Sequence, residues 1–142
     1  MTQETATPTA FEQALERYTA GESAATLLPV FKELCQQFPK SGALWSCLAW
    51  LYLLEDQGDR AYKAATKSVK LEPQSPQHHV NLVLAMLVTG QKGVRKHIEL
   101  AQRIMSMNPE VRSEVEENLA DGLARKPDWP EINRVQAWLA EG

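Results

Sequence analysis

The stretch LWSCLAWLYLLEDQGDRAYKAATKSVKLEP spans residues 44–73 and decides the fold. Its leucines recur at spacings of three and four residues from Leu44 to Leu54, which is the period of one face of an α-helix. The polar residues 56–59 interrupt that helix, and a second apolar series runs from Ala61 to Leu71 before Pro73 ends it. This stretch therefore predicts two helices that pack as a hairpin.

The hairpin pattern recurs along the chain. A shift of the sequence against itself by 34 residues superposes positions of similar character: Phe11, Trp45 and His79; Tyr18, Tyr52 and Met86; Pro39 and Pro73. Pro109 follows after two extra residues, which fit in the turn at 89–93, where an insertion costs little free energy. The chain is therefore expected to contain three units, at about 9–39, 43–73 and 77–109.

The second unit resembles the tetratricopeptide repeat (TPR) family through Trp45, Leu48, Ala49, Tyr52, Ala61 and Pro73. The other units depart from that pattern, since Leu27 replaces the alanine of the first and His79 the aromatic residue of the third. The resemblance implies an all-α fold, a right-handed superhelix of antiparallel helix pairs of the TPR-like α-solenoid kind. It also implies that the first helices of the pairs line a concave groove that binds peptides or helices of partner proteins.

The remaining segments are expected to flank these hairpins within a single domain. Residues 1–8 are polar and predict a flexible N-terminal arm. Residues 110–142 predict two capping helices, at about 110–125 and 128–140, because the last repeat would otherwise expose its apolar face. Trp129 and Trp138 are expected to be packing residues of this cap.

The concave groove is the first candidate site. The residues expected to face it are Glu12, Glu16, Ser46, Trp50, Leu53, Asn81, Leu84 and Leu87. Trp50 stands out because Trp45 already fills the aromatic position of the repeat, and tryptophan is enriched at binding hot spots. The alternative interpretation is that Trp50 packs under the neighbouring repeat.

The charge of the groove restricts its ligands. Glu12 and Glu16 stand where one TPR subfamily carries a basic clamp for acidic chaperone tails. Two carboxylates repel such a tail, so we expect a basic or apolar segment of a partner protein instead. The predicted function is thus that of an adaptor or assembly factor that serves a larger complex.

A basic stripe on the second helices, expected on the convex side, is the other candidate surface. Its residues are Arg60, Lys63, Lys67, Lys70, Lys92, Arg95 and Lys96. A solvated face explains such a stripe without any function. The functional alternative is a peripheral membrane-associated or oligomeric structural protein that docks on an anionic membrane or an acidic protein. Acidic residues follow from Glu110 to Asp121, so the chain is dipolar, which would allow head-to-tail self-association.

The composition excludes several classes of function. The net charge of −3 over 142 residues argues against nucleic-acid binding, which needs a local excess of lysine and arginine. The histidines His78, His79 and His97 have no acidic neighbours at metal-ligand spacing, and Cys47 has no basic neighbour to activate its thiol. We therefore expect no enzyme activity, metal or cofactor.

The two cysteines imply no disulfide framework, and no apolar run approaches the roughly 20 residues of a membrane span. A cytoplasmic location is expected.

Overall fold

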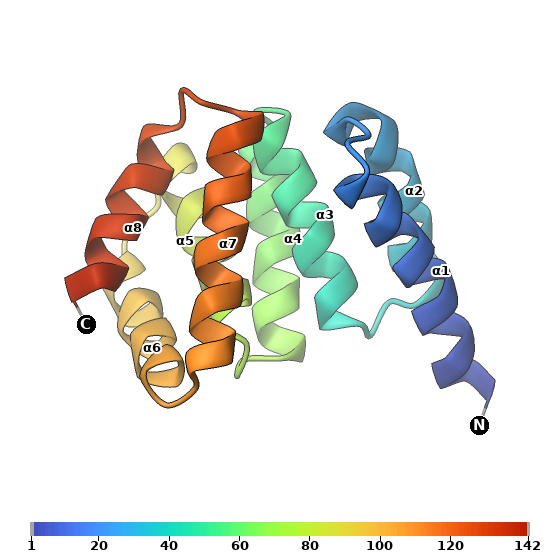
Figure 1. The fold of residues 1–142 in the computed structure, drawn as a ribbon, viewed down its shortest axis with the longest axis horizontal. Coiled ribbons are helices and arrows are strands. Elements are labelled where there is room, and N and C mark those ends of the chain that lie inside the picture. The colour runs from blue at the N-terminus through green and yellow to red at the C-terminus, as the bar shows by residue number, and fades with distance from the viewer. Residues whose placement is uncertain (1, 142) are drawn as a thin grey trace.

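The computed structural model describes the backbone of residues 2–141 and the side chains of residues 9–141. Within these residues the chain forms eight helices and no strand: α1 (Thr2–Thr19), α2 (Ala24–Gln37), α3 (Gly42–Leu54), α4 (Gly58–Leu71), α5 (Pro76–Thr89), α6 (Val94–Ser106), α7 (Pro109–Arg125) and α8 (Pro130–Glu141). Consecutive helices pack on one another and run in opposite directions (Figure 1). The predicted all-α class is confirmed.

The central hairpin forms where its sequence predicts it. Helix α3 ends at Leu54 and α4 begins at Gly58, so the turn falls on the polar residues. Ser41 begins α3 because its hydroxyl accepts a hydrogen bond from the amide of Leu44 at 3.2 Å. Ala61 and Ala65 of α4 are fully buried, as small residues at a close helix contact should be.

Helices α3 and α5 are buried on nearly all sides. Residues 48–53 of α3 and 78–86 of α5 are buried without interruption. A helix that is apolar all round needs neighbours all round. Helix α3 has α2, α4 and α5 beside it, and α5 contacts α3, α4, α6, α7 and α8. These two helices therefore carry the core of the protein.

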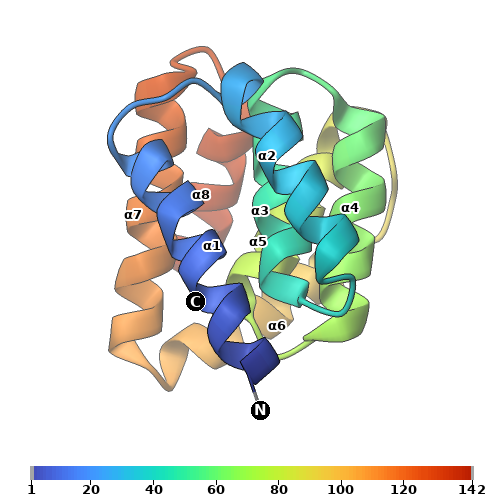
Figure 2. The ribbon, with the colours of Figure 1, turned by 90° about the vertical axis from the view of Figure 1, so that its right-hand side faces the viewer.

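The C-terminal helices cover more than the end of the α5–α6 hairpin. Helix α8 packs on α5 and α6, and α7 packs on α5, α6 and α8 (Figures 1 and 2). A hydrogen bond between Tyr18 and Asp121 links α7 to the C-terminal end of α1. Trp129, in the turn between α7 and α8, is 1% exposed, and Trp138 is half-buried. The prediction that Trp129 is a packing residue is confirmed.

The N-terminal boundary differs from the expectation. Helix α1 begins at Thr2, so its backbone continues through the segment for which the sequence predicted a flexible arm, residues 1–8. The side chains of that segment lie outside the described residues. Among the helices of residues 2–141, not one combines the length and the apolar character that crossing a membrane requires.

Candidate functional site

A cavity of about 490 Å³ lies between α1 and α7, above α3. It is called the α1/α7 groove here, and it is lined by Leu15, Tyr18, Thr19, Phe31, Ser46, Cys47, Trp50, Leu51, Gln77, Asn81, Glu117, Asn118 and Asp121. Phe31, Trp50 and Leu51 are buried and form its deep apolar side, whereas Leu15, Thr19 and Glu117 are exposed at its mouth. Three of the predicted groove residues, Ser46, Trp50 and Asn81, thus line the same cavity.

Trp50 lines this groove but is itself held by the interior. Its side chain is only 9% exposed, and its ring centre lies 5.4 Å from that of Trp129. Gly122 of α7 lets the helix approach the indole so closely that a Cβ there would lie 2.8 Å from the Trp50 ring. Of the two interpretations of Trp50, the structure supports packing, because α7 and the α7–α8 turn cover the face that a ligand would need.

A polar network joins α1 to α7 at one end of the groove. The Tyr18 hydroxyl donates to the Asp121 carboxylate and accepts a hydrogen bond from Trp50 Nε1 at 2.9 Å. The Arg125 guanidinium lies 3.6 Å from the centre of the Tyr18 ring, pairs with Asp121 at 3.3 Å and donates to the carbonyl of Glu22 at 3.0 Å. Burial, followed by the hydrogen bond to Asp121, raises the pKa of Tyr18, so its hydroxyl keeps its proton as a donor. We call this set the Tyr18 network.

Replacing Tyr18 by phenylalanine should destabilise the protein by about 1–3 kcal/mol, because the Trp50 indole N–H would be left without an acceptor. Chemical denaturation of both proteins measures this difference. Tyr62→Phe is the matched control, since no hydrogen bond engages the hydroxyl of Tyr62 within the described residues, and its stability should stay within about 0.5 kcal/mol of the parent. Equal effects of the two substitutions would contradict the network.

A second row of hydrogen bonds ties α5 to α3 and α7 across the groove. Asn81 Nδ2 donates to the hydroxyl of Ser46 at 2.8 Å and to its carbonyl at 3.1 Å. Gln77 Nε2 donates to Asn81 Oδ1 at 2.8 Å, and Asn118 Nδ2 of α7 donates to Gln77 Oε1 at 3.0 Å. The polar groups of Ser46 and Asn81 are therefore engaged within the chain.

The apolar residues predicted for the groove lie elsewhere. Leu53 is 2% exposed and Leu84 is fully buried, while Leu87 is half-buried, and these three do not line the α1/α7 groove. The correction has a physical reason, because α3, which carries Leu53, and α5, which carries Leu84 and Leu87, are packed between neighbouring helices, and their leucines fill those contacts. The apolar character that the sequence suggested for a binding face is that of a core helix.

Four glutamates of α1 and α7 are exposed on or near the walls of the groove. Glu12 and Glu16 lie on α1, and Glu114 and Glu117 lie on α7. Within residues 9–141 none of these four carboxylates forms an ion pair. Glu12 precedes Leu15 by three residues and Glu114 precedes Glu117 by three, so each shares a helix face with a groove-lining residue. Glu117 therefore places a carboxylate at the mouth of the groove, and Glu12 and Glu114 lie one helical turn from residues that line it.

The seven residues of the basic stripe are all exposed, as either interpretation of the stripe requires. The part of the chain that the structure describes gives none of them an ion-pair partner. Lys67 Nζ lies 4.4 Å from the ring centre of Trp45. Lys70, Lys92 and Lys96 surround a cavity of about 320 Å³ between α4 and α6, and the remaining stripe residues stay apart from it.

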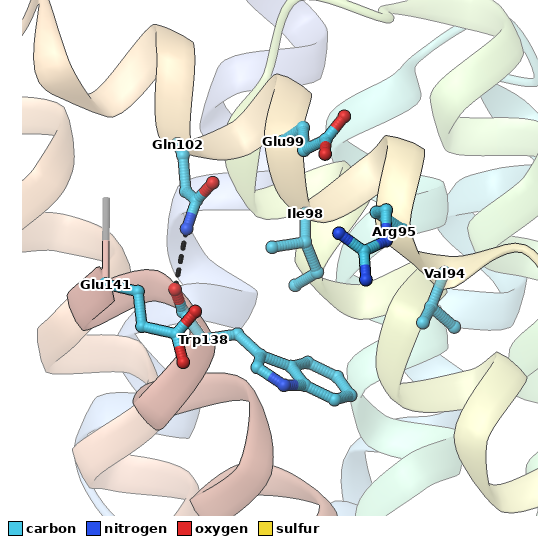
Figure 3. Close-up of a pocket in the computed structure, with 7 residues that line it drawn as sticks. All are labelled: Val94, Arg95, Ile98, Glu99, Gln102, Trp138 and Glu141. Atoms are coloured by element: carbon cyan, nitrogen blue, oxygen red, sulfur yellow. Dashed lines mark hydrogen bonds between the residues drawn. The ribbon is translucent and has the colours of Figure 1, made fainter.

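A further cavity, of about 450 Å³, lies between α6 and α8 (Figure 3). Trp138 of α8 reaches toward α6 below Arg95 and Ile98, and Gln102 Nε2 donates to the carbonyl of Trp138 at 2.6 Å. One arginine and two glutamates, Glu99 and Glu141, surround it. Because these side chains carry both positive and negative charge, the cavity favours neither an anionic nor a cationic ligand. The α1/α7 groove is therefore the better candidate.

A pair of histidines is the feature that sequence reasoning missed. His79 Nε2 donates to the carbonyl of Pro73 at 2.6 Å, so its Nδ1 must accept the hydrogen bond from His97 Nδ1 at 2.9 Å. The one sequence signal for this pair is that His79 and His97 lie 18 residues apart on the consecutive helices α5 and α6.

The lowered pKa values of two histidines predict that the protein is less stable at low pH. Burial lowers the pKa of His78, and burial together with His79 and Lys96 lowers the pKa of His97. The unfolded chain then binds more protons than the folded one, so stability is lost as the pH falls below about 6.5, by about 1.4 kcal/mol per histidine for each unit of lowered pKa. Urea denaturation at pH 7.5 and pH 5 measures this. His97→Asn, which keeps a donor near the Nδ1 position, should reduce the loss, and an unchanged pH dependence would contradict the assignment to His97.

The thiols are poorly suited to nucleophilic chemistry. Burial raises the pKa of Cys47, which lines the groove, to about 12, and burial raises the pKa of Cys35 similarly. At neutral pH both thiols stay protonated, whereas a thiolate is the reactive form.

Comparison with protein-family models finds no match to the sequence, and comparison with curated proteins finds no similar one either.

Proposed function

We propose that this protein is a non-catalytic binding module that holds a segment of a partner protein in the α1/α7 groove. The observation that carries the proposal is the groove itself, a cavity of about 490 Å³ with a buried apolar side and an exposed polar mouth. Its volume is within the range of roughly 300–1,000 Å³ that is common for ligand sites. It accommodates a few side chains of a partner segment and not a whole helix.

The proposal includes a TPR-like organisation. The pairs α1 with α2, α3 with α4 and α5 with α6 fall at the three predicted units, and α7 with α8 follow as a fourth pair. In that interpretation the pairs stack as a right-handed superhelix, and the first helix of each pair contributes to the concave side. The groove supports this assignment, because most of its lining residues belong to α1, α3, α5 and α7.

The role that fits such a site is that of an adaptor or assembly factor. Helix α7 packs on α5, and its Gly122 lies against Trp50 of α3. A partner would therefore contact the exposed residues Leu15, Thr19 and Glu117 and not the buried Trp50. A cytoplasmic, reducing compartment agrees with the two free cysteines, Cys35 and Cys47. Neither the proposed role nor the compartment requires a cofactor.

A substitution that fills the groove tests the proposal. Thr19 is exposed and lines the cavity, whereas the adjacent Ala20 is exposed and does not, so Thr19→Trp and Ala20→Trp form a matched pair. In a cross-linking pull-down from the native source, we expect Thr19→Trp to lose at least one partner that the parent and Ala20→Trp both recover. Partners lost only from a Lys63→Glu/Lys67→Glu variant would instead assign the function to the basic stripe.

A further inference from the structure

We propose that the partner segment is a basic amphipathic helix that docks on the mouth of the α1/α7 groove, where it places a lysine or arginine beside Glu117 and an apolar side chain in the cavity. This inference rests on the proposed function, because it concerns the chemistry of the ligand at the same site.

The first argument is the charge of the two walls. Glu117 of α7 lines the groove at its mouth, and Glu12 of α1 and Glu114 of α7 each lie one helical turn from a lining residue. The cations nearest to these glutamates in sequence are already engaged. Arg17 pairs with Glu22 at 2.6 Å, Arg112 with Glu116 at 3.5 Å and Arg125 with Asp121 at 3.3 Å. Within residues 9–141 the carboxylate of Glu117 thus has no ion-pair partner, and a cation from a ligand would supply one.

The second argument is the apolar surface next to these carboxylates. Leu15 is 39% exposed at the mouth, which is unusual among the large apolar side chains of residues 9–141. Below it lie Phe31, Trp50 and Leu51. A lysine side chain matches this arrangement, since its methylene stem packs on apolar surface while its ammonium group reaches toward a carboxylate. An apolar neighbour one helical turn away would fill the rest of the cavity.

The third argument is the direction from which a segment can enter. The Tyr18 network closes the groove at the C-terminal end of α1. Toward its N-terminal end α1 diverges from α3 (Figure 1), and α2 is the main element on which it packs. Leu15 is the lining residue of α1 farthest from this network and is exposed, so we place the approaching helix beside Leu15 and Glu12.

Three synthetic helical peptides with one shared apolar face test the inference. Their polar faces carry lysine, glutamine or glutamate, and their binding to the full protein is measured by fluorescence anisotropy at low and at moderate salt. We expect the lysine peptide to bind about tenfold or more tightly than the glutamine peptide, and the glutamate peptide to bind most weakly. The preference for lysine should shrink as salt screens the carboxylates.

Variants of the protein locate the contact. Glu12→Lys/Glu117→Lys should abolish the preference for the lysine peptide, whereas Glu99→Lys/Glu141→Lys, which changes the net charge equally at α6 and α8, should keep it. Thr19→Trp should weaken all binding at the groove.

Each other outcome overturns the inference in a recognisable way. Equal binding of the lysine and glutamine peptides, lost in Thr19→Trp, would leave the groove as the site and refute the basic ligand. Binding of the lysine peptide that survives Thr19→Trp would place the contact elsewhere. If no peptide binds and the protein instead self-associates at low salt through Glu117, a second copy is the occupant. If no peptide binds and the protein stays monomeric, the basic ligand is refuted, and the pull-down with Thr19→Trp separately decides the proposed function.

Discussion

Replacing Trp50 by alanine is expected to lower the free energy of unfolding by about 3–5 kcal/mol, the usual cost of removing a large aromatic side chain from a core. The indole is 9% exposed, donates to Tyr18, lies against Trp129 and sits under Gly122 of α7. All four contacts would be lost at once. Urea denaturation followed by circular dichroism measures the change.

Trp45→Ala is the control for this substitution. Trp45 is on the same helix but half-buried, and its indole donates to the carbonyl of Pro39 at 2.9 Å near the surface. Its loss should cost clearly less than the loss of Trp50. If Trp50→Ala left the stability within about 0.5 kcal/mol of the parent, Trp50 would be a surface residue and the packing of α7 described here would be incorrect.

Replacing Trp129 should show that the turn between α7 and α8 is part of the core. Trp129 is 1% exposed, so Trp129→Ala is expected to cost about 3–5 kcal/mol. Trp129 Nε1 is buried without a hydrogen-bond partner among the described residues, and Trp129→Phe removes that unsatisfied donor while it keeps an aromatic ring. Trp129→Phe should therefore cost much less than the alanine substitution.

Thermal and chemical denaturation of both variants measure this pair of effects. Trp138→Ala provides the comparison, because Trp138 is only half-buried on α8. A loss of stability as large for phenylalanine as for alanine would mean that the indole N–H has a partner and that the packing around Trp129 differs from the arrangement described above.

The local parts of the fold could be predicted from the sequence. Helices α3 and α4 follow the apolar period of residues 44–71, and the turn before Gly58 falls on the polar residues predicted for it. The two C-terminal helices were also expected, with observed limits of Pro109–Arg125 and Pro130–Glu141. These features depend on contacts between residues that are close in sequence, which periodicity and turn residues report directly.

The contacts that shape the candidate site could not be predicted in this way. Tyr18 and Asp121 are 103 residues apart, and no periodic pattern relates them. The sequence of α7 predicts no more than a polar capping helix, because its buried residues are only Val115, Leu119 and Gly122. Gly122 shows no apolar signal at all, although its lack of a side chain is what lets α7 cover Trp50.

The same limitation explains the misplaced leucines. Leu53 and Leu84 were expected on helix faces that point away from the paired helix and line a groove, but both are buried. Whether such a face is open or covered depends on elements that arrive later in the chain, here α7 and α8. The spacing of apolar residues identifies which face of a helix is apolar, but it does not identify the element that covers that face.

Chemical-shift mapping of the ¹⁵N-labelled protein, titrated with the lysine peptide, tests the central claim most directly. The claim is that a basic segment binds between α1 and α7, at the mouth of a cavity whose deep side is the buried Trp50. The account predicts shifts concentrated at Leu15, Thr19, Cys47, Glu117 and Asn118, with α4 and α6 unaffected. Shifts confined to the basic residues of α4 and α6, or a titration without shifts, would contradict it.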